Sequence, residues 1–114
     1  MDLRDAILQA SAVKTKEMEV PEWGVTISIK ETTMEKARQA REASEVDGEV
    51  DADKLTLEMF LLCVVKPGTL DPIFTRDDFE ALRNMGFCGM DKVVTEIMKI
   101  NGQGEPELKA AVKN

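Results

Sequence analysis

The sequence of 114 residues contains no histidine and no tyrosine. Histidine is the side chain that most often acts as a general base near neutral pH, and it belongs to catalytic triads and to the usual zinc and iron sites. Its absence excludes those classes of catalysis. Lysine or carboxylate chemistry stays open in principle, but we expect a chain that binds another protein, with no enzyme activity, no metal and no cofactor.

Long apolar runs and basic runs are also missing. The longest apolar run, Met59 to Val65, is far shorter than the ~20 residues of a membrane span. With 22 acidic and 15 basic residues, the net charge of -7 opposes binding to nucleic acid or to an anionic membrane, so neither is an expected partner. The two cysteines, Cys63 and Cys88, lack a CxxC spacing, and no apolar signal segment opens the chain. We therefore expect two buried free thiols in a cytoplasmic protein.

The first thirty residues change from a helical period to a strand period. One apolar stripe over residues 3–10 predicts a short amphipathic helix that ends near Ser11. Residues 16–30 then alternate between apolar and polar side chains on either side of Pro21-Glu22-Trp23-Gly24, which predicts a two-stranded antiparallel β-hairpin. Its apolar face should rest on helices, and both of its edges are candidates for pairing with another chain.

The rest of the chain predicts helices over residues 33–44, 55–65, 75–86 and 90–100, with 55–65 at the centre of the core. A buried strand is the alternative for so continuous an apolar run as 55–65. The acidic stretch 45–53 has no regular period and predicts a mobile loop. The expected fold is α+β and mainly α: four to five short helices around one apolar helix, in a single domain over residues 1–102. Residues 103–114 form a polar tail, with at most one helical turn at 108–112.

Three features have an ordinary and a functional interpretation. The acidic stretch fits a calcium loop with Asp47 at position 1 and Glu58 at position 12, but Ala52 occupies the position that needs glycine, so a solvated loop is favoured. Trp23 would ordinarily cap the core beside a helix; the alternative is an exposed anchor for a partner. Most of the seven methionines should fill the core, and some could line an adaptable groove.

The order of these parts resembles the small tail assembly chaperones of long-tailed, siphovirus-type bacteriophages and prophages. The resemblance covers roughly residues 1–102 and includes "RDAILQAS" at the start, "VKTKEMEVPEWGVTISIKE" in the hairpin and "PIFTRDDFEAL" after the apolar helix. Its most specific element is "VPEWGVTISIKE". Residues 35–53 depart from it, because they are more charged and richer in alanine than expected.

The resemblance implies a chaperone that binds the phage tape measure protein, helps to recruit tail tube protein, and leaves before the tail is finished. Such a protein would act in the host bacterial cytoplasm and be absent from the mature virion. The alternatives are a structural minor tail protein retained in the virion and an unrelated small acidic adaptor. No family motif assigns binding to single residues. The hairpin itself suggests partner-binding candidates and self-association into a ring or filament through its edges; the candidates are Trp23, Pro21, Val25, Ile27 and Ile29.

Overall fold

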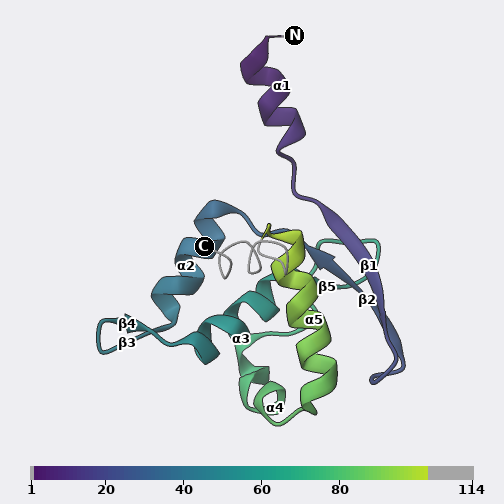
Figure 1. Ribbon diagram of the computed structural model, residues 1–114, viewed down its shortest axis with the longest axis vertical. Coiled ribbons are helices and arrows are strands. Elements are labelled where there is room, and N and C mark those ends of the chain that lie inside the picture. Colours follow the sequence, from purple (N-terminus) through teal and green to yellow (C-terminus); the bar gives the residue numbers. More distant parts are fainter. Residues whose placement is uncertain (1, 103–114) are drawn as a thin grey trace, which may run out of the picture.

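The structure is a computed structural model that describes residues 2–102 (Figure 1). The predicted polar tail, 103–114, lies outside the described residues. Within them the chain forms five α-helices and two small antiparallel sheets, which confirms the α+β class. About half of the described chain is helical.

The elements follow one another with short connections, except between β5 and the turn of 3₁₀ helix, η1. Their bounds are α1 Leu3–Ala10, β1 Thr15–Val20, β2 Val25–Lys30, α2 Met34–Ala43, β3 Glu45–Val46, β4 Glu49–Val50, α3 Ala52–Cys63, β5 Val64–Val65, η1 Arg76–Asp78, α4 Phe79–Arg83 and α5 Phe87–Ile100.

The larger sheet has three strands in the order β1-β2-β5, where the sequence predicts two. β1 and β2 pair from Thr15 opposite Lys30 to Val20 opposite Val25, and Gly24 takes a positive φ of 66° in the turn between them. β5 then pairs with β2 on its other edge, at Ser28 and Ile29. One edge of the hairpin is therefore partly covered within the chain, and the outer edge belongs to β1.

The third strand, β5, follows directly after α3, which ends earlier than the sequence predicts. The helix begins after Asp51, whose carboxylate accepts a hydrogen bond from the Lys54 backbone N–H at 2.9 Å, and it ends at Cys63. The β-branched residues Val64 and Val65 then continue as a strand. The apolar run of 55–65 is thus a helix over most of its length and a buried strand at its end.

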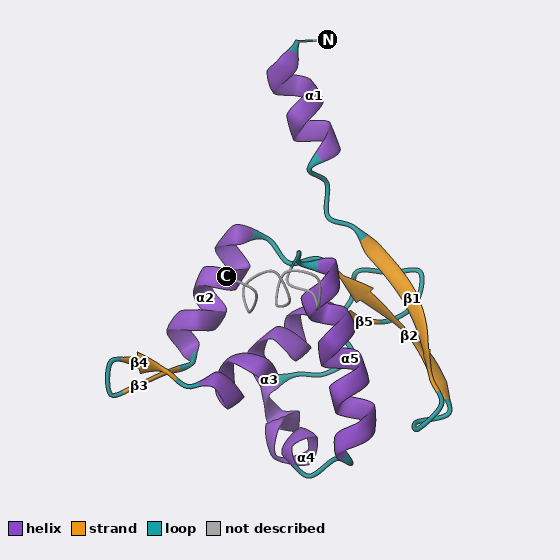
Figure 2. Ribbon diagram, in the orientation of Figure 1, coloured by secondary structure: helices purple, strands orange, loops and turns teal. Residues whose placement is uncertain are grey.

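The core lies between the sheet, α3 and α5. α5 packs against β1 and β2, while α2 packs against the other side of α3 (Figures 1 and 2). The fully buried side chains at the centre include those of Val20, Ile29, Phe60, Leu82 and Val93. Cys63 is also buried, and burial raises the pKa of its thiol. Cys88 is exposed at the start of α5, so the prediction of two buried thiols is wrong for Cys88.

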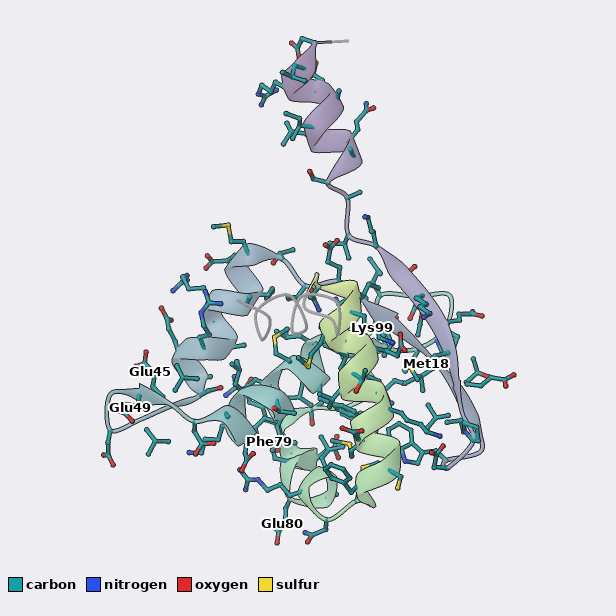
Figure 3. All side chains as sticks on the ribbon, viewed as in Figure 1. Met18, Glu45, Glu49, Phe79, Glu80 and Lys99 are labelled. Atoms are coloured by element: carbon teal, nitrogen blue, oxygen red, sulfur yellow. The ribbon has the colours of Figure 1, made fainter. Side chains whose placement is uncertain are left out.

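The sequence predicts an irregular loop for the acidic stretch 45–53, and the structure shows regular elements there instead. Glu45–Val46 and Glu49–Val50 pair as the small hairpin β3–β4, which projects from the molecule (Figure 3), and α3 begins at Ala52. Asp47 and Gly48 both have positive φ, 54° and 83°. That is the geometry of a type I′ turn, for which Asp-Gly is a preferred pair. The mobility of this segment stays a prediction.

Candidate protein-binding surfaces

Two of the five predicted partner-binding residues lie in the core. Ile27 and Ile29 are 4% and 0% exposed, because this face of β2 packs against α3 and α5. Their side chains fasten the hairpin to the helices and are not available to a partner of the folded protein. For these two residues the structure corrects the prediction.

Trp23 occupies an intermediate position at the tip of the hairpin. Its indole is half-buried and makes an edge-on contact with Phe60, with ring centroids 6.4 Å apart and an interplanar angle of 75°. It also lies directly on Gly89 of α5: a Cβ at that position would be 2.4 Å from the indole Nε1. Trp23 therefore caps the core beside a helix, the ordinary role considered from the sequence, and only its outer part faces solvent.

Pro21 and Val25 are the predicted residues that remain exposed. They flank the turn, and Val25 is 50% exposed. Glu19, Thr26 and Gly24 lie around them in a shallow hollow. The outer edge of β1 begins beside this hollow, while Met18 turns inward and packs against the core (Figure 3). The hairpin thus offers a small exposed surface made of its turn and the edge of β1.

Two ion pairs hold this hairpin to α5. Lys16 Nζ lies 3.0 Å from Glu96 Oε2, and Lys92 of α5 pairs with Glu22 of the turn. The hydrogen bond from Lys16 lowers the pKa of Glu96, and the hydrogen bond from Lys92 lowers the pKa of Glu22, both from an ordinary value of 4.5. Because all four residues sit near the surface, these pairs mainly set the orientation of the hairpin.

A more apolar surface lies on the opposite side of α5, where the sequence placed no site. Here α3 and α5 enclose a groove of about 250 Å³. Its walls are mainly aliphatic and thioether side chains, those of Leu55, Met59, Val94, Ile97 and Met98. A second hollow continues from it toward α2, where Met34 is 89% exposed. The sequence signal for this groove was the high methionine content, although it did not indicate which methionines take part.

The helix α1 is a second surface that the sequence left unassigned. Its amphipathic pattern was predicted, but none of its residues is buried in the structure. Leu3, Ile7 and Leu8 are all more than half exposed. Figure 1 shows α1 projecting beyond the sheet, away from the other helices. An apolar stripe that packs against nothing in its own chain is a candidate contact surface.

Other kinds of site have less support in the described part of the chain. Among residues 2–102, no cluster of three or more cysteine, aspartate or glutamate side chains is arranged to hold a metal ion. None of the helices in the same range has the length and hydropathy needed to cross a bilayer.

The comparison with solved structures agrees with the fold. No protein-family model matches the chain, and no curated protein matches it in sequence. Among solved structures, the fold is similar to that of the bacteriophage HK97 tail assembly chaperone, with a TM-score of 0.56 and 19% sequence identity. The match covers 85% of this chain and 97% of the HK97 chain. The chain therefore has a fold like that of a phage tail assembly chaperone.

Proposed function

We propose that the chain is a phage tail assembly chaperone, which binds the tape measure protein, keeps it soluble and helps to recruit tail tube subunits. One observation carries the proposal: the fold is similar to that of the HK97 tail assembly chaperone over 97% of the latter's length. The resemblance in the hairpin and in "PIFTRDDFEAL" points the same way. The protein would act without catalysis in the host cytoplasm and leave before the tail is complete.

The exposed surfaces fit this role physically. A tape measure protein contains long apolar helical stretches that need cover before the tail tube surrounds them. The groove between α3 and α5 is lined by apolar side chains that include Met59 and Met98, and methionine adapts to varied partner shapes. The net charge of -7 would keep the resulting complex soluble. Contacts of moderate strength, repeated along the partner, would allow release.

The hairpin turn is the second contact that we propose for the partner. Pro21, Val25 and the outer part of Trp23 form its exposed apolar surface. The edge of β1 beside them offers backbone groups for strand addition. Ile27 and Ile29 would support this surface from inside, since both are buried.

Co-expression with the matching tape measure protein tests the proposal. We expect most of that protein to be soluble when this chain is present and aggregated when it is absent. Unchanged solubility would overturn the proposal and favour the unrelated adaptor. Finding the chain in stoichiometric amounts in purified virions would instead favour a structural minor tail protein.

A matched pair of variants tests the hairpin contact. Val25→Asp places a charge on the turn, whereas Val50→Asp places one on β4, where the valine is similarly exposed (44% against 50%). We expect Val25→Asp to weaken binding of the tape measure protein by about tenfold, the effect of losing one apolar contact of ~1.4 kcal/mol. Val50→Asp should leave binding unchanged. Equal binding by both variants would remove the turn from the contact surface.

A further inference from the structure

We propose that the C-terminal segment, residues 103–114, docks into the α3–α5 groove of its own copy of the chain. The side chains of Leu108, Ala111 and Val112 would enter the groove and cover it until a partner displaces them. The inference goes beyond the proposed function, because it concerns a contact within one chain and its test needs no tail protein.

The first observation is that the described part of the chain ends at the groove itself. Asn101 lines the α3–α5 groove and also the hollow that continues it toward α2. Its side chain is held in place, since Oδ1 accepts a hydrogen bond from the Thr32 backbone N–H at 2.9 Å and Nδ2 donates one to the Ile97 carbonyl at 2.8 Å. The C-terminal segment therefore starts from a fixed point beside this apolar surface.

Gly102 then stops α5, so the helix does not carry the chain away from the groove. Its φ is 81°, and its N–H donates a hydrogen bond to the Lys99 carbonyl at 3.1 Å. A glycine with positive φ directly after the last turn is a common end of a helix. Further along, Pro106 and Glu107 are residues favoured in the first turn of a helix, which agrees with the helical turn that the sequence predicts at 108–112.

The segment is long enough to cover the whole groove. Five residues, 103–107, separate Gly102 from Leu108, and an extended chain over this distance spans up to about 20 Å. Along α5 the groove runs from Asn101 to Val94, a distance of about 10 Å at 1.5 Å per residue. Leu108 can therefore reach any part of the groove.

The apolar side chains of the segment match the groove in spacing and size. Leu108, Ala111 and Val112 are three and four residues apart, so a helical turn brings them to one face. The α5 wall of the groove presents Val94 and Met98, which are also four residues apart and form a ridge against which such a face packs. The groove of about 250 Å³ has room for small apolar side chains, since a water molecule takes ~30 Å³.

Charge and attachment favour the chain's own segment as the occupant. Residues 108–114 contain Lys109 and Lys113 and no acidic side chain, whereas the whole chain has a net charge of -7. A cationic segment is therefore attracted to the rest of the molecule. A short linker also gives a tethered segment an effective concentration in the millimolar range, so a contact with a Kd below about 1 mM would be mostly formed.

Cleavage of the full chain by trypsin after Lys109 tests the proposal, because docking should protect this bond. A synthetic peptide of residues 103–114 gives the unprotected rate. Met98→Asp charges the groove wall, and Leu70→Asp is the control, since Leu70 is 56% exposed and lies outside the groove. We expect Met98→Asp to be cleaved about tenfold faster than the wild type and Leu70→Asp, because cleavage follows the population of the open form. Circular dichroism checks folding.

Three results of this experiment would overturn the proposal. The first is a wild type that is cleaved as fast as the peptide, and the second is a rate that Met98→Asp leaves unchanged. The third is protection that disappears on dilution, because a contact within one chain does not depend on protein concentration.

The methionine methyl signals in NMR spectra give a direct readout from the groove. Leu108→Asp should shift the signals of Met59 and Met98, which line the groove, and leave that of Met18, which packs against the hairpin side of the core. Gln103→Asp, a charge in the same segment outside the apolar face, is the control and should shift none of them. Identical spectra of the wild type and Leu108→Asp would contradict docking. No tail protein is present, so these results are independent of whether the chain keeps a tape measure protein soluble.

Discussion

At the scale of single residues, the contact between Trp23 and Gly89 explains why the hairpin tip sits where it does. The indole lies on the helix surface at the one position of α5 that has no side chain. It also completes an aromatic row with Phe60 and Phe74, whose ring centroids are 5.6 Å apart. A sequence shows that Trp23 is in a turn and that Gly89 is in a helix, but their meeting depends on tertiary packing.

Gly89→Ala should destabilise the protein, although alanine usually stabilises a helix by about 1 kcal/mol relative to glycine. The new Cβ would lie 2.4 Å from Trp23 Nε1 and 2.9 Å from Cε2. The indole is rigid and must move as a whole, and overpacking of this kind costs about 1–3 kcal/mol. We expect a lower urea midpoint and a red shift of the Trp23 fluorescence. The smaller ring in Trp23→Phe/Gly89→Ala should restore part of the loss, and a Gly89→Ala protein more stable than the wild type would contradict the contact.

At the scale of elements, the ion pair between Lys16 of the hairpin and Glu96 of α5 should make the stability of the fold depend on pH. The pKa of Glu96 is lowered by the hydrogen bond from Lys16, so the unfolded chain binds a proton at this carboxylate more readily than the folded chain does. The stabilisation is therefore present above the ordinary pKa of 4.5 and is lost as the pH falls through the lowered value.

Comparison of Lys16→Met with the wild type isolates this effect. At pH 7 we expect the variant to have a lower urea midpoint, and the difference should shrink as the pH falls below 4.5 and through the lowered pKa of Glu96 in the folded chain. Lys54→Met, which removes an exposed lysine from the first turn of α3, is the control. A difference between wild type and Lys16→Met that stays constant down to acid pH would show that the lysine stabilises the hairpin by some means other than its charge.

How well each element could be predicted depended on how local its cause is. The hairpin turn at Pro21-Glu22-Trp23-Gly24 and the start of η1 are set by neighbouring residues; the Asp78 carboxylate accepts a hydrogen bond from the Thr75 N–H at 2.9 Å, as its spacing suggests. β3–β4 also has a local cause, the Asp-Gly pair, from which this hairpin could have been predicted. β5 has no local cause, because Val64 and Val65 form a strand only where β2 offers an edge.

The same distinction applies to the candidate site. The alternation of apolar and polar side chains along β2 predicts that the hairpin has an apolar face. It does not indicate whether that face packs against helices of the same chain or binds a partner. In the structure, Ile27 and Ile29 pack against the helices. The α3–α5 groove combines residues about forty positions apart, Leu55 and Met98 among them, so no window of sequence contains it.

At the scale of the whole molecule, the chain divides into a packed body and an arm. The body contains the sheet and the helices α2 to α5, and the side chains buried in its core begin at Val20. α1 adds apolar surface to the molecule without burying any. Because no residue of α1 is buried, the helix should contribute little to the stability of the body.

Deletion of residues 2–11 tests this division. At a concentration where the wild type is monomeric, we expect the free energy of unfolding to change by less than about 0.5 kcal/mol, because surface changes without buried contacts have effects of this size. The urea m-value should fall only slightly, since α1 is already exposed in the folded chain and its unfolding adds little newly exposed surface. A loss of more than about 1 kcal/mol, the size of a buried contact, would mean that α1 packs on its own body in solution.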